Sequence, residues 1–394
     1  MNTYTIHIAY PKEKIEASRR RIEAARRFEY VDRVPVVLGV FTRYLLNQRG
    51  VGYGEYLSSA RANLIHQLEN YKWLLEHVEE DRCTSTDIVV GPDFENIPSA
   101  SAFGAPIVYQ DDVPPRALPY VSAIDDMARV PEATPEDGLW GKGIEWALEW
   151  RRLLQDEVQV YFNGKRARVR VSVGAYALGP FSTAVDLAGE RFYEWLYAAP
   201  QECHALLAKI TRAMIRMEQY CRKHVAEERT GGFGLAEDSA QIISVKQFRE
   251  FVVPYCRQLY EAFPGERLMH MCGTSGHLLE SLRDDLHITA FYGFGSPVDP
   301  ALVAQKLGGH AQLQGNIDCL LLREGPPERI VEAIWDALEK LAPVGGYLLC
   351  DGCNIIPGTP VEHLNLMVRT AERFGLPARK CPHGHTTNAK EGIQ

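Results

Sequence analysis

Short apolar runs alternate with amphipathic segments from the start of the chain. Residues 11–30 are rich in Arg, Glu and Ala and poor in Gly and Pro, which predicts a surface helix. RVPVVLGVF (33–41) combines β-branched residues with flanking breakers and predicts a buried strand. An amphipathic helix is expected over 60–78, and TDIVV (86–90) predicts a second buried strand. The chain therefore begins as helix, strand, helix and strand.

Two segments in the middle of the chain break this alternation. Residues 111–140 hold many prolines and acidic residues, which predict a long surface loop. VQVYFNGKRARVRVSV (158–173) alternates apolar and polar residues on both sides of an Asn-Gly pair, a strong signal for a β-hairpin. We therefore expect an inserted hairpin before the alternation resumes.

A regular rhythm of strands and helices occupies the rest of the chain. GAYALGPFSTAVDLAG leads into a long helix over about 189–228, and GGFGLAED leads into a helix that covers VKQFREFVVPYCRQLYEAF. Four later apolar runs are each followed by a helical segment: ERLMHMC, ITAFYGFG, AQLQGNID and GGYLLCDGC. Short strands that alternate with helices predict right-handed βαβ units and a parallel sheet.

The number of these repeats favours one architecture. Over the whole chain they come close to eight, which favours a closed (β/α)8 TIM barrel over an open doubly wound sheet. A Rossmann fold is disfavoured because no G-x-G-x-x-G follows the first strand. The expected organisation is α/β, with an N-terminal helical extension at 1–30, a barrel at 31–378 that carries the inserted hairpin, and a flexible C-terminal tail at 379–394.

Composition narrows the class of protein. The 394 residues include 51 acidic and 43 basic side chains, for a net charge of −8, and no basic patch stands out. We therefore expect no nucleic-acid partner. No apolar stretch approaches the roughly 20 residues that span a bilayer, so no membrane insertion is expected. The N-terminus, MNTYTIHIAYPKEK, lacks the layout of a secretion signal, which indicates a cytoplasmic protein.

The cysteines also indicate a reducing environment. They number nine, an odd count, and they are scattered through a long chain. This pattern indicates no disulfide framework, with most thiols buried as small apolar groups. Cys350, in the middle of a predicted strand, is expected to be one of them. Cys381, His383 and His385 in the tail are expected to be incidental ligands on a flexible terminus.

Polar and sulfur side chains gather at the predicted strand ends, where TIM barrels build their active sites. These residues are Asp87, Glu237, Asp238, His270, Cys272, Asn316, Asp318, Asp351 and Cys353. His270 and Cys272 lie two apart on one strand, so their side chains point to the same face. Cys353 ends a later strand and comes within reach of them if both strand ends meet at one barrel mouth.

Three interpretations of the His-x-Cys pair stay open on this basis: two metal ligands, a thiol paired with a base, or two core residues. One imidazole and two thiolates suit a zinc ion and leave one position for water, a carboxylate or substrate. Glu237 or Asp238 would be that carboxylate, although either would also serve to cap the following helix. For Asn316 and Asp318 the alternative is a structural role, in which Asx-type hydrogen bonds fix their loop.

Four motifs in this order, HMCG, QGNID, DGCN and PGTPVEH, resemble the uroporphyrinogen decarboxylase superfamily. The most similar branch is the zinc-dependent corrinoid methyltransferases of the methylcobalamin:coenzyme M type. GPFSTAVDLAG (179–189) is similar to the superfamily's Gly-Pro-Phe-Thr segment, and DSAQIISVKQFREFVVPY is similar to a further motif. The similarity covers roughly residues 30–378 and is strongest from residue 179 onward.

The resemblance implies a (β/α)8 barrel and methyl transfer between a corrinoid (methylcobalamin) cofactor and a thiol or another small acceptor or donor, including O-demethylation. It implies Zn²⁺ held by His270, Cys272 and Cys353, with Glu237 or Asp238 as a possible displaceable fourth ligand. The implied partners are a corrinoid protein and a small-molecule methyl donor or acceptor, with a homodimer as a further option. The residues expected in the chemistry are Asp238, Asp87 and Asn316, and those expected to contact the cofactor are Asp318 and Tyr292.

The decarboxylase branch is the alternative, and it uses no metal. Its Arg-rich segment of the form R-Q-A-G-R-Y corresponds here to VFTRYLLNQRG, which keeps only Arg43 and Tyr44. Asp87 does resemble the decarboxylase aspartate that faces the tetrapyrrole nitrogens. Without the Arg cluster the substrate carboxylates are poorly paired, which disfavours this branch. A third hypothesis is a corrinoid- or tetrapyrrole-binding protein without catalytic activity.

Overall fold

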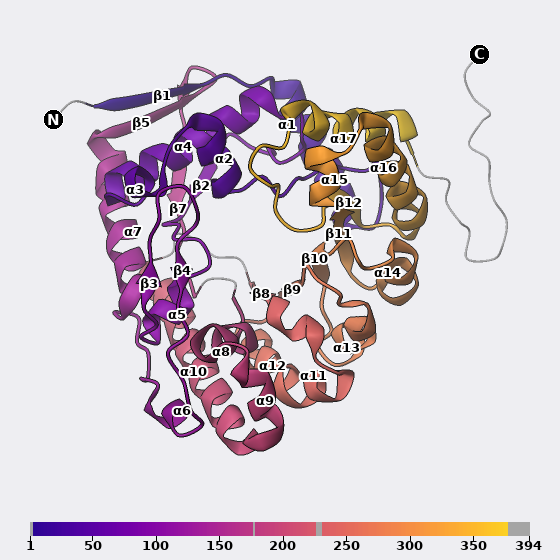
Figure 1. Ribbon diagram of the computed structural model, residues 1–394. Coiled ribbons are helices and arrows are strands. Elements are labelled where there is room, and N and C mark those ends of the chain that lie inside the picture. Colours follow the sequence, from indigo (N-terminus) through magenta and orange to yellow (C-terminus); the bar gives the residue numbers. More distant parts are fainter. Residues whose placement is uncertain (1–2, 176–177, 226–230, 377–394) are drawn as a thin grey trace, which may run out of the picture. The chain divides into compact units, whose positions relative to one another are not determined.

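The computed structural model describes residues 3–175, 178–225 and 231–376 (Figure 1). The chain divides into two compact units. Unit 1 combines Met1–Tyr10, Thr42–Leu74 and Thr86–His270, and unit 2 combines Pro11–Phe41, Leu75–Ser85 and Met271–Gln394. The predicted tail at 379–394, with Cys381, His383 and His385, lies outside the described residues.

Apart from β1 (Tyr4–Ile8) and β5 (Val158–Phe162), which also pair in parallel, the described part of unit 1 contains four parallel strand segments. β2 (Ile88–Val90) pairs with β7 (Val169–Val171), and β8 (Gly232–Ala236) pairs with β9 (Glu266–His270). Downstream of β7, Leu178 forms a parallel bridge to Ala236 at the end of β8. β2 buries Ile88 and Val90, and β7 buries Val171, as expected for strands covered by helices.

The helices of unit 1 pack through their apolar faces. The described helices that lie wholly or mainly in this unit are α2 (Thr42–Arg49), α3 (Tyr53–Tyr56), α4 (Ala60–His77), α5 (Pro98–Ala102), α6 (Asp126–Arg129), α7 (Gly138–Asp156), α8 (Pro180–Ala188), α9 (Arg191–Ala198), α10 (Pro200–His224), α11 (Val245–Phe251) and α12 (Val253–Ala262). In α10, buried residues recur every three or four positions, as in Cys203, Leu206, Ile210 and Met217. This is the spacing of one helix face.

Unit 2 contains a second set of four parallel strand segments. β10 (Ala290–Phe294), β11 (Gln312–Ile317) and β12 (Tyr347–Asp351) pair in that order, and Val36 forms a parallel bridge to Leu349 in β12. The described helices of this unit are α1 (Lys12–Arg26), α13 (Leu279–Asp284), α14 (Pro300–Leu307), α15 (Cys319–Glu324), α16 (Pro327–Leu341) and α17 (Val361–Phe374). α16 packs on β11, β12 and α17 through buried residues that include Ile330 and Ile334 (Figure 1).

The α/β class and the parallel pairing agree with the prediction from sequence. Four segments in each unit make eight, which is the number of repeats that the hydrophobic pattern indicates. Most of the segment expected as a buried strand over 33–41 is buried, although Phe41 is exposed and only Val36 makes a ladder bridge. In the described part of the chain no helix is long and apolar enough to cross a bilayer.

The N-terminal residues contain a strand as well as the predicted helix. β1 (Tyr4–Ile8) pairs in parallel with β5 (Val158–Phe162), so the first ten residues belong to unit 1. The predicted hairpin forms at Asn163 and Gly164, whose φ values of 51° and 77° suit the tight two-residue turn. Its second arm, β6 (Lys165–Arg166), is only two residues long. The prediction was wrong beyond that point, because β7 leaves the hairpin and joins β2.

The long helix predicted over about 189–228 is also wrong as one element. The chain forms α9 and α10, with the break at Ala199 and Pro200. A residue before proline is pushed out of the helical region, and Ala199 has φ of −147° and ψ of 59°. The loop predicted over 111–140 is largely irregular and includes two short elements, β4 (Arg116–Ala117), which pairs with β3 (Ile107–Val108), and α6.

Candidate metal centre

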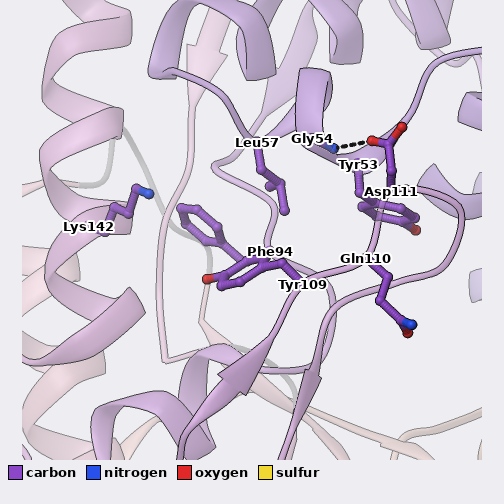
Figure 2. Close-up of a pocket in the computed structure, with 8 residues that line it drawn as sticks. All are labelled: Tyr53, Gly54, Leu57, Phe94, Tyr109, Gln110, Asp111 and Lys142. Carbon is purple, nitrogen blue, oxygen red and sulfur yellow. Dashed lines mark hydrogen bonds between the residues drawn. The ribbon is translucent and has the colours of Figure 1, made fainter.

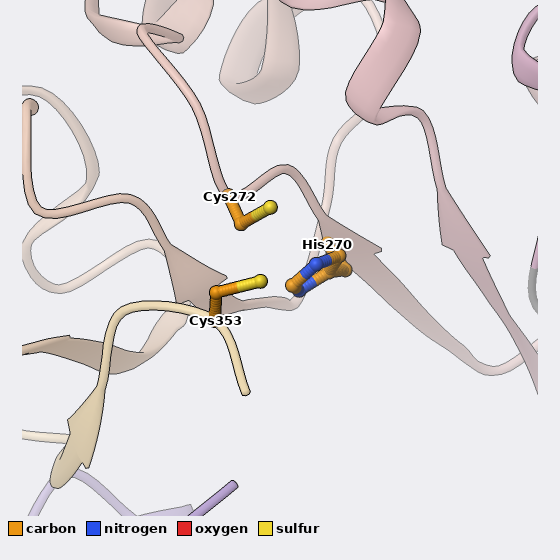
Figure 3. A group of neighbouring side chains, drawn as sticks. All are labelled: His270, Cys272 and Cys353. Atoms are coloured by element: carbon orange, nitrogen blue, oxygen red, sulfur yellow. The ribbon is translucent and has the colours of Figure 1, made fainter. Parts of the chain in front are cut away.

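Three of the sequence-predicted ligands lie together in the structure. His270 is the last residue of β9, Cys272 follows two positions later, and Cys353 comes two positions after β12. One ligand atom from each of them lies within 4.8 Å of the others, and the three side chains converge in Figure 3. All three are half-buried, so a small molecule is able to reach the group.

The donor set fits zinc. Zinc bonds of about 2.3 Å to sulfur and about 2.0–2.1 Å to nitrogen place tetrahedral ligands roughly 3.5–3.8 Å apart. The three ligand atoms, which lie within 4.8 Å of one another here, would reach that geometry through small side-chain movements. One imidazole and two thiolates are donors that zinc prefers, and they leave a fourth position open, as in catalytic zinc sites.

Asp238 is the carboxylate next to this group. Its Oδ1 atom lies 3.4 Å from His270 Nε2. Asp238 begins a short 3-10 helix directly after β8, and the backbone N–H of Glu237 donates to the His270 carbonyl oxygen at 3.1 Å. The Asp238 carboxylate is therefore in position to orient the imidazole from its far nitrogen, or to move onto a metal as a fourth ligand.

Glu237 lies apart from the three-residue group and has another contact. Its buried carboxylate accepts the backbone N–H groups of Phe181 and Ser182 at the start of α8, at 3.1 and 2.8 Å. Burial raises the pKa of Glu237 to about 7, and the two amide hydrogen bonds oppose that rise. A Cβ atom at Gly179 would overlap the same carboxylate, which explains the glycine that opens the GPF segment.

The backbone of Cys272 is held by the loop that follows β10. A Cβ atom at Gly295 would overlap the Cys272 carbonyl oxygen, so this position requires glycine. Asn316, which is almost fully buried, donates from Nδ2 to the carbonyl oxygens of Gly295 and Val298, at 3.3 and 2.8 Å. Asn316 thus fixes the loop against which Cys272 packs.

Asp318 and Asp351 also make structural contacts. Asp318 accepts the N–H of Leu321 and the hydroxyl of Ser296, each at 2.7 Å, and so caps α15. Asp351 is fully buried and accepts the N–H of Gly39 at 2.5 Å. The contacts of Asp318 are of the kind expected under the loop-fixing alternative for the QGNID motif.

The remaining sequence-predicted residues lie elsewhere. Asp87 directly precedes β2 and so stands at the amino end of that strand, whereas TIM-barrel sites form at carboxyl ends. The expectation that Asp87 ends a strand is therefore wrong. Tyr292 lies in the middle of β10 and is half-buried.

Sequence reasoning missed two carboxylates at the carboxyl end of β2. Asp93 accepts the hydroxyls of Thr42 and Tyr56 at 2.5 and 2.9 Å, and Glu95 accepts the hydroxyl of Tyr53 at 2.5 Å. Glu95 has φ of 58°, which is unusual for a residue with a side chain. Burial raises the pKa of Glu95. The sequence could have indicated these two carboxylates, since GPDFEN directly follows a predicted strand.

Two further cysteines flank the group without belonging to it. Cys350 is buried in β12, as predicted. Cys319 lies near Cys353, and burial, with the charge of Asp351 second, raises the pKa of the Cys319 thiol to about 12. Cys319 therefore stays protonated at neutral pH. The described part of the chain contains no disulfide.

Curated proteins of two activities are similar to this chain. The methylated-thiol--coenzyme M methyltransferase of Methanosarcina mazei is 26% identical over 252 residues, which cover 62% of this chain and 64% of that protein. The uroporphyrinogen decarboxylase of Anaeromyxobacter dehalogenans is 28% identical over 216 residues, which cover 52% of this chain and 60% of that protein. The chain thus spans less than two thirds of the length of these two relatives.

Fold similarity extends further than sequence similarity. The solved structure of a methyltransferase from Methanosarcina mazei matches 91% of this chain and 99% of its own, with a TM-score of 0.66 and 19% identity. Residues 85–374 match the uroporphyrinogen decarboxylase (URO-D) family, and this match spans well over half of the sequence. The motifs that gather His270, Cys272 and Cys353 lie within it. On this match the chain belongs to the uroporphyrinogen decarboxylase family.

Proposed function

We propose that this protein is a zinc-dependent methyltransferase that moves a methyl group between a corrinoid cofactor and a thiol or another small acceptor or donor. The observation that carries the proposal is the convergence of His270, Cys272 and Cys353. The similarity to a methylated-thiol--coenzyme M methyltransferase supports the same activity. A corrinoid protein is the proposed partner, because the corrinoid has to be presented to the site.

The contacts of each residue indicate its role in the proposed reaction. His270, Cys272 and Cys353 would hold the ion. Zinc supplies, when bound, a Lewis acid that favours the ionised form of a thiol at neutral pH. Asp238, whose Oδ1 lies 3.4 Å from His270 Nε2, would accept from the ring and fix its orientation. Asn316 and Gly295 keep the Cys272 backbone in place, so its thiolate points in one direction.

We further propose that the eight parallel strand segments close into a (β/α)8 barrel. The support is the count of four segments in each unit and the fold similarity to a solved methyltransferase. In such a barrel the carboxyl ends of β9 and β12, which carry the three ligands, form the functional face. Specificity for the methyl donor or acceptor would then lie in the loops on that face.

The decarboxylase alternative keeps the support of the decarboxylase relatives. One contact disfavours it. Arg43, the arginine that remains of the decarboxylase cluster, pairs with Glu95 at 3.2 Å. Its guanidinium is thereby engaged by the protein's own carboxylate, which leaves less charge for a substrate that carries many carboxylates. A corrinoid- or tetrapyrrole-binding protein without activity is the third candidate.

Metal analysis tests the proposal. Protein purified under reducing conditions should contain about one zinc per chain, and Cys353→Ser and Cys272→Ser should lose it. Cys319→Ser is the matched control, because Cys319 lies near Cys353 but outside the group, and this variant should keep its zinc. Folded protein without zinc would end the proposal.

Turnover then separates the three candidates. The zinc protein should demethylate methylcobalamin with a thiol acceptor and should stop when a chelator is added. Metal-independent turnover of uroporphyrinogen would decide for the decarboxylase. Spectral shifts with cobalamin, without demethylation by any thiol tried, would decide for a binding protein.

A further inference from the structure

Unit 1 contains a cavity of about 430 Å³ whose walls include none of His270, Cys272 and Cys353 (Figure 2). Its walls include Tyr53, Leu57, Phe94, Tyr109, Asp111 and Lys142. A cavity of this size is at the small end of ligand sites, which are commonly 300–1,000 Å³ and mostly apolar with a few placed polar groups. The residues lining it come from α3, α7, the loop after β2 and the loop after β3, so several elements build it.

The aromatic walls are held in position before any ligand arrives. Tyr53 and Phe94 are buried, and the Tyr53 hydroxyl donates to Glu95 at 2.5 Å. Phe94 packs against Trp146 with ring centroids 4.8 Å apart. Tyr109 is about half exposed, and its ring lies beside that of Phe94 in Figure 2. A planar ring is the ligand shape that such walls stabilise best.

Lys142 supplies positive charge at one side of the cavity. It projects from α7, and its ammonium group lies 5.9 Å from the centre of the Phe94 ring and 4.9 Å from that of Trp146. Among the residues that the structure describes, no carboxylate lies within ion-pair distance of Lys142. In Figure 2 its amine end points toward the rings. Lys142 is exposed to solvent, and its ammonium group, which lies over these two rings, is available to pair with an anionic ligand in the cavity.

Asp111 supplies a hydrogen-bond acceptor at the other side. Its Oδ1 atom accepts the N–H of Gly54 at 2.7 Å, the dashed bond in Figure 2, and the Tyr53 N–H donates to its carbonyl oxygen at 2.8 Å. A Cβ atom at Gly52 would overlap this carboxylate, so the backbone is shaped around it. The carboxylate repels an anion and attracts a donor, and this orients an asymmetric ligand.

We propose that this cavity binds a small aromatic carboxylate. The ligand ring lies against Phe94 and Tyr109, its carboxylate pairs with Lys142, and a donor such as a ring hydroxyl faces Asp111. The cavity is a ligand site in its own right, and the inference stands whether or not His270, Cys272 and Cys353 hold zinc.

Calorimetric titration of the full chain with benzoate and 4-hydroxybenzoate tests the proposal. Both should bind saturably, and benzyl alcohol, which has the ring but no charge, should bind at least about tenfold more weakly. Lys142→Met keeps the alkyl stem and removes the charge, so it should raise the Kd for benzoate about tenfold. Lys165→Met, an exposed lysine of unit 1 in β6, is the matched control and should not change the Kd.

Three further variants test the same contacts with milder changes, so that a folding defect in one variant does not decide the result. Lys142→Arg should retain binding, and Tyr109→Ala should weaken it more than Tyr109→Phe does, because the ring is the contact. The titrations are repeated on chelator-treated protein, so that loss of zinc and loss of ligand binding are told apart. Equal binding of benzoate and benzyl alcohol, or an unchanged Kd in Lys142→Met, would overturn the proposal.

Discussion

Asp186 in α8 shows how burial of a single carboxyl group sets the pH dependence of stability. Desolvation raises its pKa from 3.8 to about 6. The folded state therefore binds the proton more tightly than the unfolded state does. The stability that this provides is present at low pH and is lost as the pH rises toward and through 6.

Asp186→Asn should accordingly stabilise the protein at pH 7 and change little near pH 4. The shift corresponds to at most about 3 kcal/mol, because one pKa unit is about 1.4 kcal/mol. Urea unfolding at several pH values between 4 and 8 measures it. Asp112→Asn, on an exposed loop residue, is the control and should leave the pH profile unchanged. A variant that is no more stable than wild type at pH 7 would contradict the assignment.

Asp238 offers a second test at this scale. If its carboxylate accepts the His270 ring N–H, Asp238→Ala should weaken zinc binding on the order of 10–100-fold. Asp238→Asn, whose amide oxygen still accepts, should then lose less. Equal losses in both variants would instead indicate a direct fourth ligand. Competition with a chromophoric chelator gives the affinities, and unchanged affinity in both variants would remove Asp238 from the site.

Residue identity predicted the convergence of His270, Cys272 and Cys353 better than it predicted the contacts of the residues around them. His270, Cys272 and Cys353 stood out because imidazole and thiols at strand ends are rare and chemically specific. Asn316 and Asp318 were equally visible, yet their contacts are with backbone amides and carbonyls nearby. A polar side chain at a strand end can either bind a ligand or fix a nearby loop. Only the position of the surrounding backbone groups decides between these two roles.

The loop after β10 is the element on which the position of Cys272 depends. Gly295→Ala places a methyl group onto the Cys272 carbonyl oxygen, so the loop or the ligand has to move. We expect this variant to lose most of its zinc although no ligand is changed. Gly276→Ala is the control, because a Cβ there would make only tolerable contacts, at 3.4 Å or more.

Metal content and circular dichroism together decide the outcome. A Gly295→Ala protein that folds and keeps one zinc per chain would show that the loop does not position Cys272. A Gly295→Ala protein that folds and loses zinc would show that the loop holds Cys272 in position. The Gly276→Ala protein calibrates the effect of an added methyl group alone.

Element types followed from the pattern of apolar residues, whereas element ends and partners did not. The periodicity of α10 continues through α9, so only the geometry that Pro200 imposes on Ala199 separates the two helices. β7 alternates as a hairpin arm would, but its partner is β2, about eighty residues earlier. Alternation reports which side of a strand is buried and contains no information about the neighbouring strand.

At the scale of the whole molecule, zinc should act as a stabilising ligand. An ion that binds only the folded chain adds about 4 kcal/mol at a free concentration a thousand times its Kd. The Tm should therefore fall when a chelator is added and recover with zinc, in wild type and in Cys319→Ser. Cys353→Ser should show neither change, and an equal response in that variant would place the stabilising ion elsewhere.

The contact between the segment around Val36 and β12, the last strand of the described residues, has a consequence for how the protein is made. Gly39 donates to Asp351, 312 residues later, and Val36 pairs with Leu349. Most of unit 1 lies in the single stretch Thr86–His270 and can assemble as it leaves the ribosome. The apolar segment around Val36, by contrast, emerges early and has to wait for β12. The nascent chain therefore exposes an unpaired apolar segment for most of its synthesis, which is the interval in which a chaperone would be needed most.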